Sequence, residues 1–107
     1  MIKVMYNRNY NRVTVEGHAN SGEPGHDLVC AAASTLAYTL AANVANMADN
    51  RQLIIEDMEL CEGKAEIRCK PHHRYKATVS MVMAAVCVGF ELLAHDYPQY
   101  ITYEIHG

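Results

Sequence analysis

The sequence predicts an α+β fold in which two largely apolar helices pack on a mostly antiparallel sheet, with the elements in the order ββαββαβ. Short segments in which apolar and polar residues alternate predict strands, and two long segments rich in alanine, valine and leucine predict helices. Glycine, proline, asparagine and aspartate separate these segments where turns are needed. Half of the 107 residues are apolar, so residues 1–107 are expected to form one domain with its own core.

The first two strands are predicted to form a hairpin. The strand that follows Met1 has apolar residues at even positions, and the strand that ends before Gly17 has them at odd positions. A two-residue turn at Arg8-Asn9 would place Val4 opposite Val13, so that both side chains face the core.

A polar loop that contains glycines, residues 17–26, leads into the first predicted helix, residues 27–48. Asp27 is a good N-cap because its carboxylate accepts hydrogen bonds from the first free amides of a helix. Asp49-Asn50 ends the helical pattern. Apolar residues surround this helix almost completely, which indicates that most of its surface is buried.

A second hairpin is predicted from residues 53–61 and 64–70, joined by a turn at Glu62-Gly63. Alternating apolar residues again define one face of each strand. With this turn Met58 lies opposite Ile67 on the apolar face.

The remaining elements are a helix and a final strand. Pro71 ends the preceding strand, the helix is predicted at residues 76–95 with Pro98 just beyond it, and the last strand is predicted at residues 100–105. The apolar run 79–93 within this helix is too short for a membrane span and includes a glutamate. We therefore expect a buried core helix and no membrane partner.

Charge and cysteine content exclude some classes of function. Nine basic and twelve acidic residues, mixed along the chain, give a net charge of −3. Such a balance lacks the basic footprint of nucleic-acid-binding proteins, so no direct nucleic-acid partner is expected. The N-terminal segment does not have the pattern of a signal peptide, which predicts a cytoplasmic protein. Its four cysteines are then expected to be free thiols.

The segment from Gly17 to Cys30 contains the residues of a cysteine-nucleophile site. If Asp27 caps the helix, Cys30 is its third residue, where the partial positive charge of the helix N-terminus stabilises a thiolate. A nearby imidazole would accept the thiol proton and later protonate the leaving group. His18 and His26 both qualify, and we favour His18 because it directly follows a strand.

The alternative interpretation is that Cys30 is a buried structural residue, because free cysteines are among the most buried residue types. The other cysteines fit a chemical role less well. Cys87 lies inside the second helix, where we expect it to be buried. In the predicted hairpin Cys69 opposes Glu56, and Cys61 lies about five residues away along the ladder, too far for a disulfide or a shared metal. Cys69 and the two histidines that follow it are too few ligands for a zinc site, so no metal and no cofactor are expected.

Two motifs together resemble a known family. Gly-His-Ala at residues 17–19, a glycine-bearing loop, and Asp-Leu-Val-Cys-Ala-Ala-Ala-Ser at residues 27–34 resemble the ribosomal-processing cysteine proteases, a family called Prp. The resemblance covers nearly the whole chain in length and in element order. Leu28 and Ala33 stand where the family more often has isoleucine and valine, and both changes are conservative.

The resemblance implies a cysteine endopeptidase with a Cys–His dyad, in which Cys30 is the nucleophile and His18 the general base and acid. It implies that a short N-terminal extension is removed from the precursor of a large-subunit ribosomal protein during ribosome assembly. It also implies a homodimer, and a loop before the cysteine helix that moves when substrate binds. The residues expected to gate the site or to bind substrate are Gly22, Gly25, His26, Asp27 and Ser34.

Two other functions remain open from the residues alone. One is a non-enzymatic, ribosome-associated binding module in which Cys30 has only a structural role. The other is a different cysteine hydrolase, such as a thioesterase, that uses the same dyad. The rate of alkylation of Cys30 would test the first, and substrate profiling would test the second.

Overall fold

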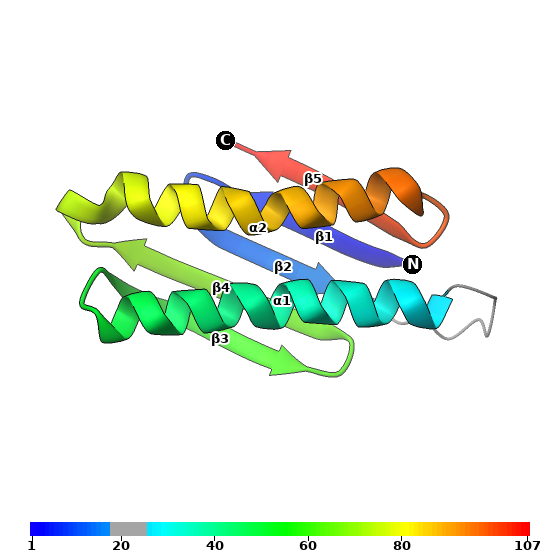
Figure 1. Ribbon diagram of the computed structural model, residues 1–107, viewed down its shortest axis with the longest axis horizontal. Coiled ribbons are helices and arrows are strands. Elements are labelled where there is room, and N and C mark those ends of the chain that lie inside the picture. Colours follow the sequence, from blue (N-terminus) through cyan, green and yellow to red (C-terminus); the bar gives the residue numbers. More distant parts are fainter. Residues whose placement is uncertain (18–25) are drawn as a thin grey trace.

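The computed structural model describes residues 1–17 and 26–107, apart from the side chains of residues 26 and 27. Its elements follow the predicted order ββαββαβ, with one short 3-10 helix added before the second α-helix (Figure 1). The predicted α+β class is confirmed. The elements are β1 Ile2–Asn7, β2 Arg12–Glu16, α1 His26–Asp49, β3 Leu53–Cys61, β4 Lys64–Pro71, η1 His73–Tyr75, α2 Lys76–Asp96 and β5 Ile101–His106.

The five strands form one sheet in the order β3-β4-β2-β1-β5, and both helices lie side by side on the same face of it (Figure 1). Three of the four strand pairs are antiparallel, as predicted, and β5 pairs with β1 in parallel. The parallel pair arises because α2 runs back along the sheet before β5 begins at the outer side of β1.

The first hairpin has a different register from the one predicted. Val4 lies opposite Val15, and Tyr6 lies opposite Val13, because the turn spans four residues, 8–11, and not two. The amide of Asn9 donates a hydrogen bond to the side-chain oxygen of Asn7, and Asn11 has a positive φ of 47°. Asparagine adopts that backbone conformation more readily than most residues, which favours the longer turn. The shift by two residues leaves every side chain on its predicted face.

The second hairpin has the predicted turn and the predicted pairing of Met58 with Ile67. Gly63 has a φ of 78°, which a glycine adopts without steric cost. A bulge between Ile55 and Asp57 changes the register further along, so that Cys69 lies opposite Ile55 and not opposite Glu56 as predicted. The extra residue in the bulged strand accounts for the shift.

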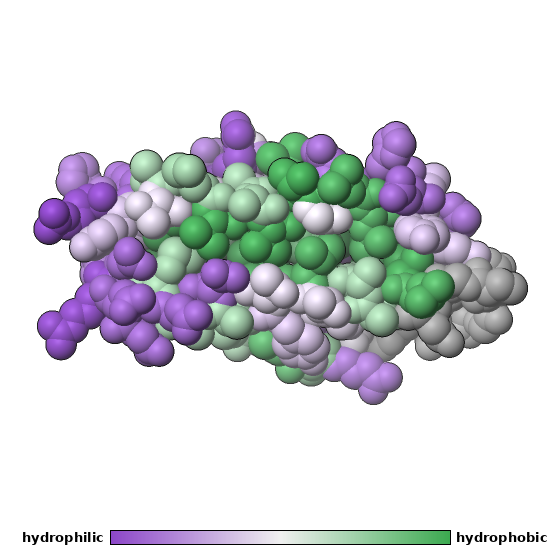
Figure 2. All heavy atoms as spheres, viewed as in Figure 1, coloured by the Kyte–Doolittle hydropathy of each residue, from purple (hydrophilic) through white to green (hydrophobic). Residues whose placement is uncertain are grey.

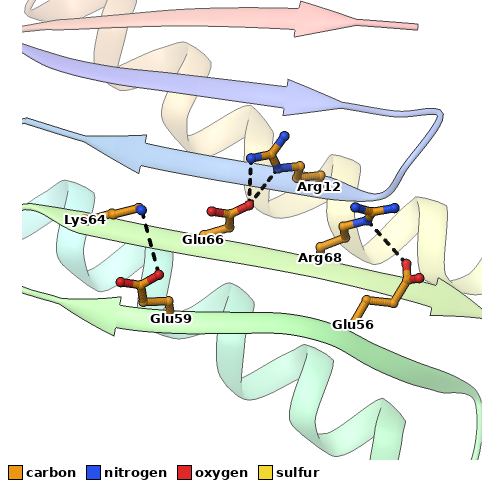
Figure 3. Close-up of polar contacts among 6 residues, drawn as sticks. All are labelled: Arg12, Glu56, Glu59, Lys64, Glu66 and Arg68. Atoms are coloured by element: carbon orange, nitrogen blue, oxygen red, sulfur yellow. Dashed lines mark hydrogen bonds and ion pairs between the residues drawn. The ribbon is translucent and has the colours of Figure 1, made fainter.

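The core lies between the sheet and the two helices. Alternate residues of β1, β2 and β4 point toward the helices, and each helix contributes residues at helical spacing. The opposite face of the sheet carries ion pairs between neighbouring strands, including Arg12 with Glu66 at 2.7 Å and Lys64 with Glu59 at 3.8 Å (Figure 3). The largest fully buried side chains are Tyr6, Phe90, Leu40, Ile67, Met83 and Ile101.

Both helices are longer than the apolar run 79–93. The segments Leu28–Asp49 and His73–Asp96 are each long and apolar enough to cross a membrane by length and composition, although the run 79–93 alone is too short. Core helices of globular proteins meet the same criteria. Here each helix packs only one face on the sheet, so the prediction that the helices are buried over most of their surface was wrong. The outward face of α2 is also apolar, and Figure 2 shows a hydrophobic band over the helices.

Candidate active site

A cavity of about 440 Å³ lies beside the first turns of α1. One wall is α1 itself, with Cys30, Ser34 and Tyr38. The other walls are the end of β2 at Gly17 and the turn between β3 and β4, residues 61–64. The predicted nucleophile therefore lies in a hollow large enough to receive side chains of a peptide.

The helix that carries Cys30 begins at His26, one residue before the predicted cap. Asp27 is therefore a residue of the helix, and Cys30 is its fifth residue and not its third. Side chains on an α-helix tilt toward its N-terminus, so Cys30 still projects toward the turn whose amides have no partner within the helix. Cys30 is half-buried, packs against the core and lines the cavity.

Gly17 holds the end of β2 against its neighbours. Its amide donates a hydrogen bond to the carbonyl oxygen of Gly63, at 3.0 Å. Its φ is +129°, and a Cβ at this position would collide with the carbonyl oxygen of Met1. Only glycine fits such a backbone conformation and such a close approach. The structure therefore requires glycine at position 17, directly before His18.

Gly17→Ala is expected to destabilise the protein by at least about 2 kcal/mol, because the new methyl group meets backbone atoms that have no room to move. Thermal unfolding followed by circular dichroism measures the loss. Gly107→Ala is the matched control, since Gly107 also has a positive φ but its added Cβ would meet only the side chain of Asn9. Equal melting temperatures for Gly17→Ala and the unchanged protein would contradict this prediction.

Several predicted site residues lie outside the described part of the chain. They are His18, Gly22 and Gly25, together with the side chains of His26 and Asp27. Their predicted roles, including that of His18 as base, stay predictions. Ser34 is described, is exposed, and lies in the cavity wall one helical turn after Cys30.

Sequence reasoning missed two parts of the cavity. Tyr38 follows Cys30 by eight residues, so the spacing of one helical face would have identified it. The turn at residues 61–64 carries no such signal, because only the packing of α1 on the sheet brings it beside Cys30. As a result Cys61, which the sequence did not connect with the site, shares the cavity with Cys30.

The four cysteines fall into two environments. Cys69 and Cys87 are buried, as predicted, and burial raises the pKa of Cys69 to about 11 and that of Cys87 to about 12. Both stay protonated near neutral pH and are poor nucleophiles. Cys61 is exposed, and its sulfur lies 3.9 Å from a carboxylate oxygen of Glu59. Of the two cavity cysteines, only Cys30 lies near a helix N-terminus, where a thiolate is stabilised.

Within residues 1–17 and 26–107, no three histidine, cysteine, aspartate or glutamate side chains gather as a metal site would require. The cavity instead combines an open space with a thiol that lies near the start of α1. Helix N-terminal amides can stabilise an oxyanion, and a thiolate beside them can attack a carbonyl carbon. The arrangement therefore fits acyl transfer through a cysteine.

Comparison with known proteins identifies a matching family and several solved structures of similar fold. The model of the family described as cysteine protease Prp matches residues 1–102. A solved structure of SMU.848 from Streptococcus mutans is 28% identical, with 98% of this chain and 91% of that chain covered and a TM-score of 0.69.

Two solved structures are of the essential ribosomal processing protease Prp from S. aureus. One is in complex with a substrate peptide and has a TM-score of 0.73, and the other is in complex with a covalently linked product peptide and has a TM-score of 0.72. Both are 22% identical to this chain, with 98% of this chain and 99% of that chain covered. Comparison with curated protein sequences finds no significant match.

Proposed function

Because this chain belongs to the cysteine protease Prp family and is a cysteine protease, we propose that it removes a short N-terminal extension from the precursor of a large-subunit ribosomal protein. Cys30 is the nucleophile and His18 is the general base. The observation that carries the proposal is that Cys30 and Gly17, the residue directly before His18, line one cavity at the start of α1. The S. aureus relative has the same fold and is a ribosomal processing protease that was solved with a substrate peptide.

In the proposed cycle, His18 takes the proton of the Cys30 thiol, and the thiolate attacks the carbonyl carbon of the scissile peptide bond. Amides at the start of α1 stabilise the oxyanion of the tetrahedral intermediate. The intermediate collapses to a thioester, and His18 protonates the departing amine. Water then hydrolyses the thioester and releases the new carboxylate together with the free thiol.

The cavity supports a peptide substrate with apolar side chains. Ala33, Ala37 and Leu60 contribute apolar surface beside Cys30. A side chain that enters this space would lose contact with water and so contribute binding energy. Gly22, Gly25, His26, Asp27 and Ser34 are the residues proposed to bind substrate or to gate its entry.

The test is incubation with a peptide that carries an N-terminal extension with an apolar, aromatic-containing stretch. The expected result is a single cut after that stretch, identified by mass spectrometry. A peptide with the same residues in scrambled order is the control and is expected to stay intact. Hydrolysis of small acyl thioesters without cleavage of the peptide would contradict the proposal and favour a thioesterase.

The enzyme is proposed to act in the cytoplasm, where ribosomes assemble, as one catalytic domain. Its net charge of −3 favours encounter with a basic ribosomal protein, because opposite charges speed association. No step of the proposed reaction needs a metal or an organic cofactor, since the thiol and the imidazole supply the nucleophile and the proton transfers.

A homodimer is proposed through the outward face of the helices. On α2 the apolar side chains of Met81, Val88 and Leu92 are exposed to 72%, 50% and 59%, and on α1 the side chain of Leu28 is exposed to 70%. The three α2 residues recur at helical spacing and so lie on one side of the helix. Figure 2 shows the hydrophobic band over these helices. A contiguous apolar patch on a folded protein marks an interaction surface.

The double substitution Met81→Glu and Leu92→Glu is expected to convert the dimer into a monomer, because two charges would be buried without partners. Size-exclusion chromatography with light scattering measures the mass. Thr102→Glu, at an exposed position of β5 on the sheet, is the matched control and is expected to stay dimeric. A monomeric unchanged protein at micromolar concentration would contradict the dimer and leave the protease assignment intact.

A further inference from the structure

A second hollow lies where β4 extends beyond the end of β2. The two strands pair from Glu16 and Lys64 to Arg12 and Arg68, and β4 then continues to Pro71 without a partner on that side. The turn at residues 8–11 folds over this gap, where the Cys69 amide donates a hydrogen bond to the Asn11 carbonyl at 3.2 Å and the Cys69 sulfur lies 4.0 Å from the same oxygen. A cavity of about 540 Å³ remains between this turn, β4 and the first turns of α2. We call this cavity the β4 notch.

The β4 notch is strongly basic although the chain as a whole is acidic. Arg8, Arg68, Lys70 and Lys76 line it, and Glu56 is the one acidic residue among the described residues that line it. The whole chain has nine basic residues, so nearly half of them surround this one hollow. Like charges in one hollow repel each other, which makes an anion in the β4 notch favourable.

Much of this positive charge is not neutralised. Lys70 and Lys76 are exposed, and neither side chain makes a hydrogen bond or ion pair with the described part of the chain. No acidic residue lies in the first turn of α2, where Lys76 begins the helix. Both ammonium groups are therefore available to a ligand.

The two arginines are partly engaged. Arg8 donates two hydrogen bonds to the carbonyl oxygen of Gly107, from Nε at 3.0 Å and from Nη2 at 2.5 Å. Nε of Arg68 lies 3.4 Å from Oε1 of Glu56, an ion pair visible in Figure 3, but this buried nitrogen donates no hydrogen bond to any described residue. The guanidinium carbon of Arg68 lies 5.6 Å from the centre of the Tyr10 ring. Glu56 and the Tyr10 ring thus hold the Arg68 side chain in place, while its guanidinium group makes no hydrogen bond with the described residues.

We infer that the β4 notch binds a phosphate group carried by a small ligand no larger than a nucleotide. Arginine and lysine together are the usual protein partners of phosphate. The basic groups surround a hollow and do not form a stripe along one face, which favours a compact ligand over a nucleic-acid strand. Tyr10, exposed to 58% at the rim, offers a ring against which a base could stack.

The β4 notch is separate from the candidate active site. Figure 1 shows the start of α1, which carries Cys30, and the start of α2, which borders the β4 notch, at opposite ends of the long axis. The molecule extends 45 Å along that axis. The inference therefore does not depend on the protease assignment.

The test is titration of the intact protein with pyrophosphate, ADP and adenosine, followed through its backbone amide NMR signals. Pyrophosphate and ADP are expected to shift the signals of residues 8–11 and 68–76, and adenosine, which lacks the phosphate, is expected to shift none of them. Lys70→Glu combined with Lys76→Glu is expected to weaken ADP binding by about tenfold or more, because two attractive charges become repulsive. Lys3→Glu, an exposed position on β1, is the matched control and is expected to keep the affinity.

Four outcomes would overturn the inference. They are the absence of shifts at residues 8–11 and 68–76, shifts spread over the whole surface, an equal loss of affinity in Lys3→Glu, and stronger binding of single-stranded RNA that increases with strand length. The last would assign the β4 notch to nucleic acid. Thermal unfolding of the double variant shows whether it is folded, and an unfolded variant would be replaced by Lys70→Gln with Lys76→Gln, for which the same loss is expected at smaller size.

Discussion

Cys30→Ala is expected to abolish cleavage of the extension peptide, with a loss of about a thousandfold or more in kcat/KM. Without the sulfur no thioester can form, and the cavity and the helix amides alone cannot supply a nucleophile. The peptide should still bind, since the methyl group of alanine leaves the walls of the cavity in place. The measurement is cleavage of the peptide by chromatography, together with its affinity for the variant by calorimetry.

The matched control for this substitution is Cys61→Ser, because Cys61 lies in the same cavity and is exposed. It is expected to keep cleavage within a few-fold of the unchanged protein. Loss of activity in Cys61→Ser with activity retained in Cys30→Ala would assign the nucleophile to the β3–β4 turn. That result would contradict the proposed dyad but not the family.

His18→Ala is expected to slow cleavage by about a hundredfold or more and to change how the alkylation of Cys30 depends on pH. With His18 present, iodoacetamide should label Cys30 quickly near neutral pH, because the imidazolium and the helix N-terminus stabilise the thiolate. Without it, the labelling rate should rise only at more alkaline pH, as for an ordinary thiol.

The experiment uses the Cys61→Ser background, since exposed Cys61 would label as well. Buried Cys69 and Cys87 act as internal standards that should label slowly. His26→Ala is the control, because His26 is the rival base. If His26→Ala shifts the pH profile and His18→Ala does not, then His26 is the base.

The strand pairings show how much the local sequence determines. Glu62-Gly63 specified a tight turn, and the pairing of Met58 with Ile67 followed directly from it. Arg8-Asn9 is a weak turn signal, and there the observed turn is two residues longer than predicted. The bulge near Glu56 had no sequence signal, because any residue can occupy such a position when the neighbouring strand requires it.

The active-site prediction divides in the same way. Cys30 could be identified as a candidate nucleophile because helix starts have local signals and their effect on a thiol is local. The exact start of α1 differed by one residue, which moved Asp27 from the cap into the helix. The β4 notch had no signal, since its basic residues come from the first turn of the chain, from β4 and from α2.

The sequence by itself determined the order of strands and helices, the side of each strand that faces the core and the cysteine to which chemistry is assigned. These follow from periodicity and from the preferences of turns and helix ends, which act over a few residues. Only the tertiary structure decided that the turn at 61–64 closes the cavity beside Cys30, and that four distant basic residues surround one hollow. The reason is that burying the faces of two long helices on one sheet brings together segments whose sequences carry no information about each other.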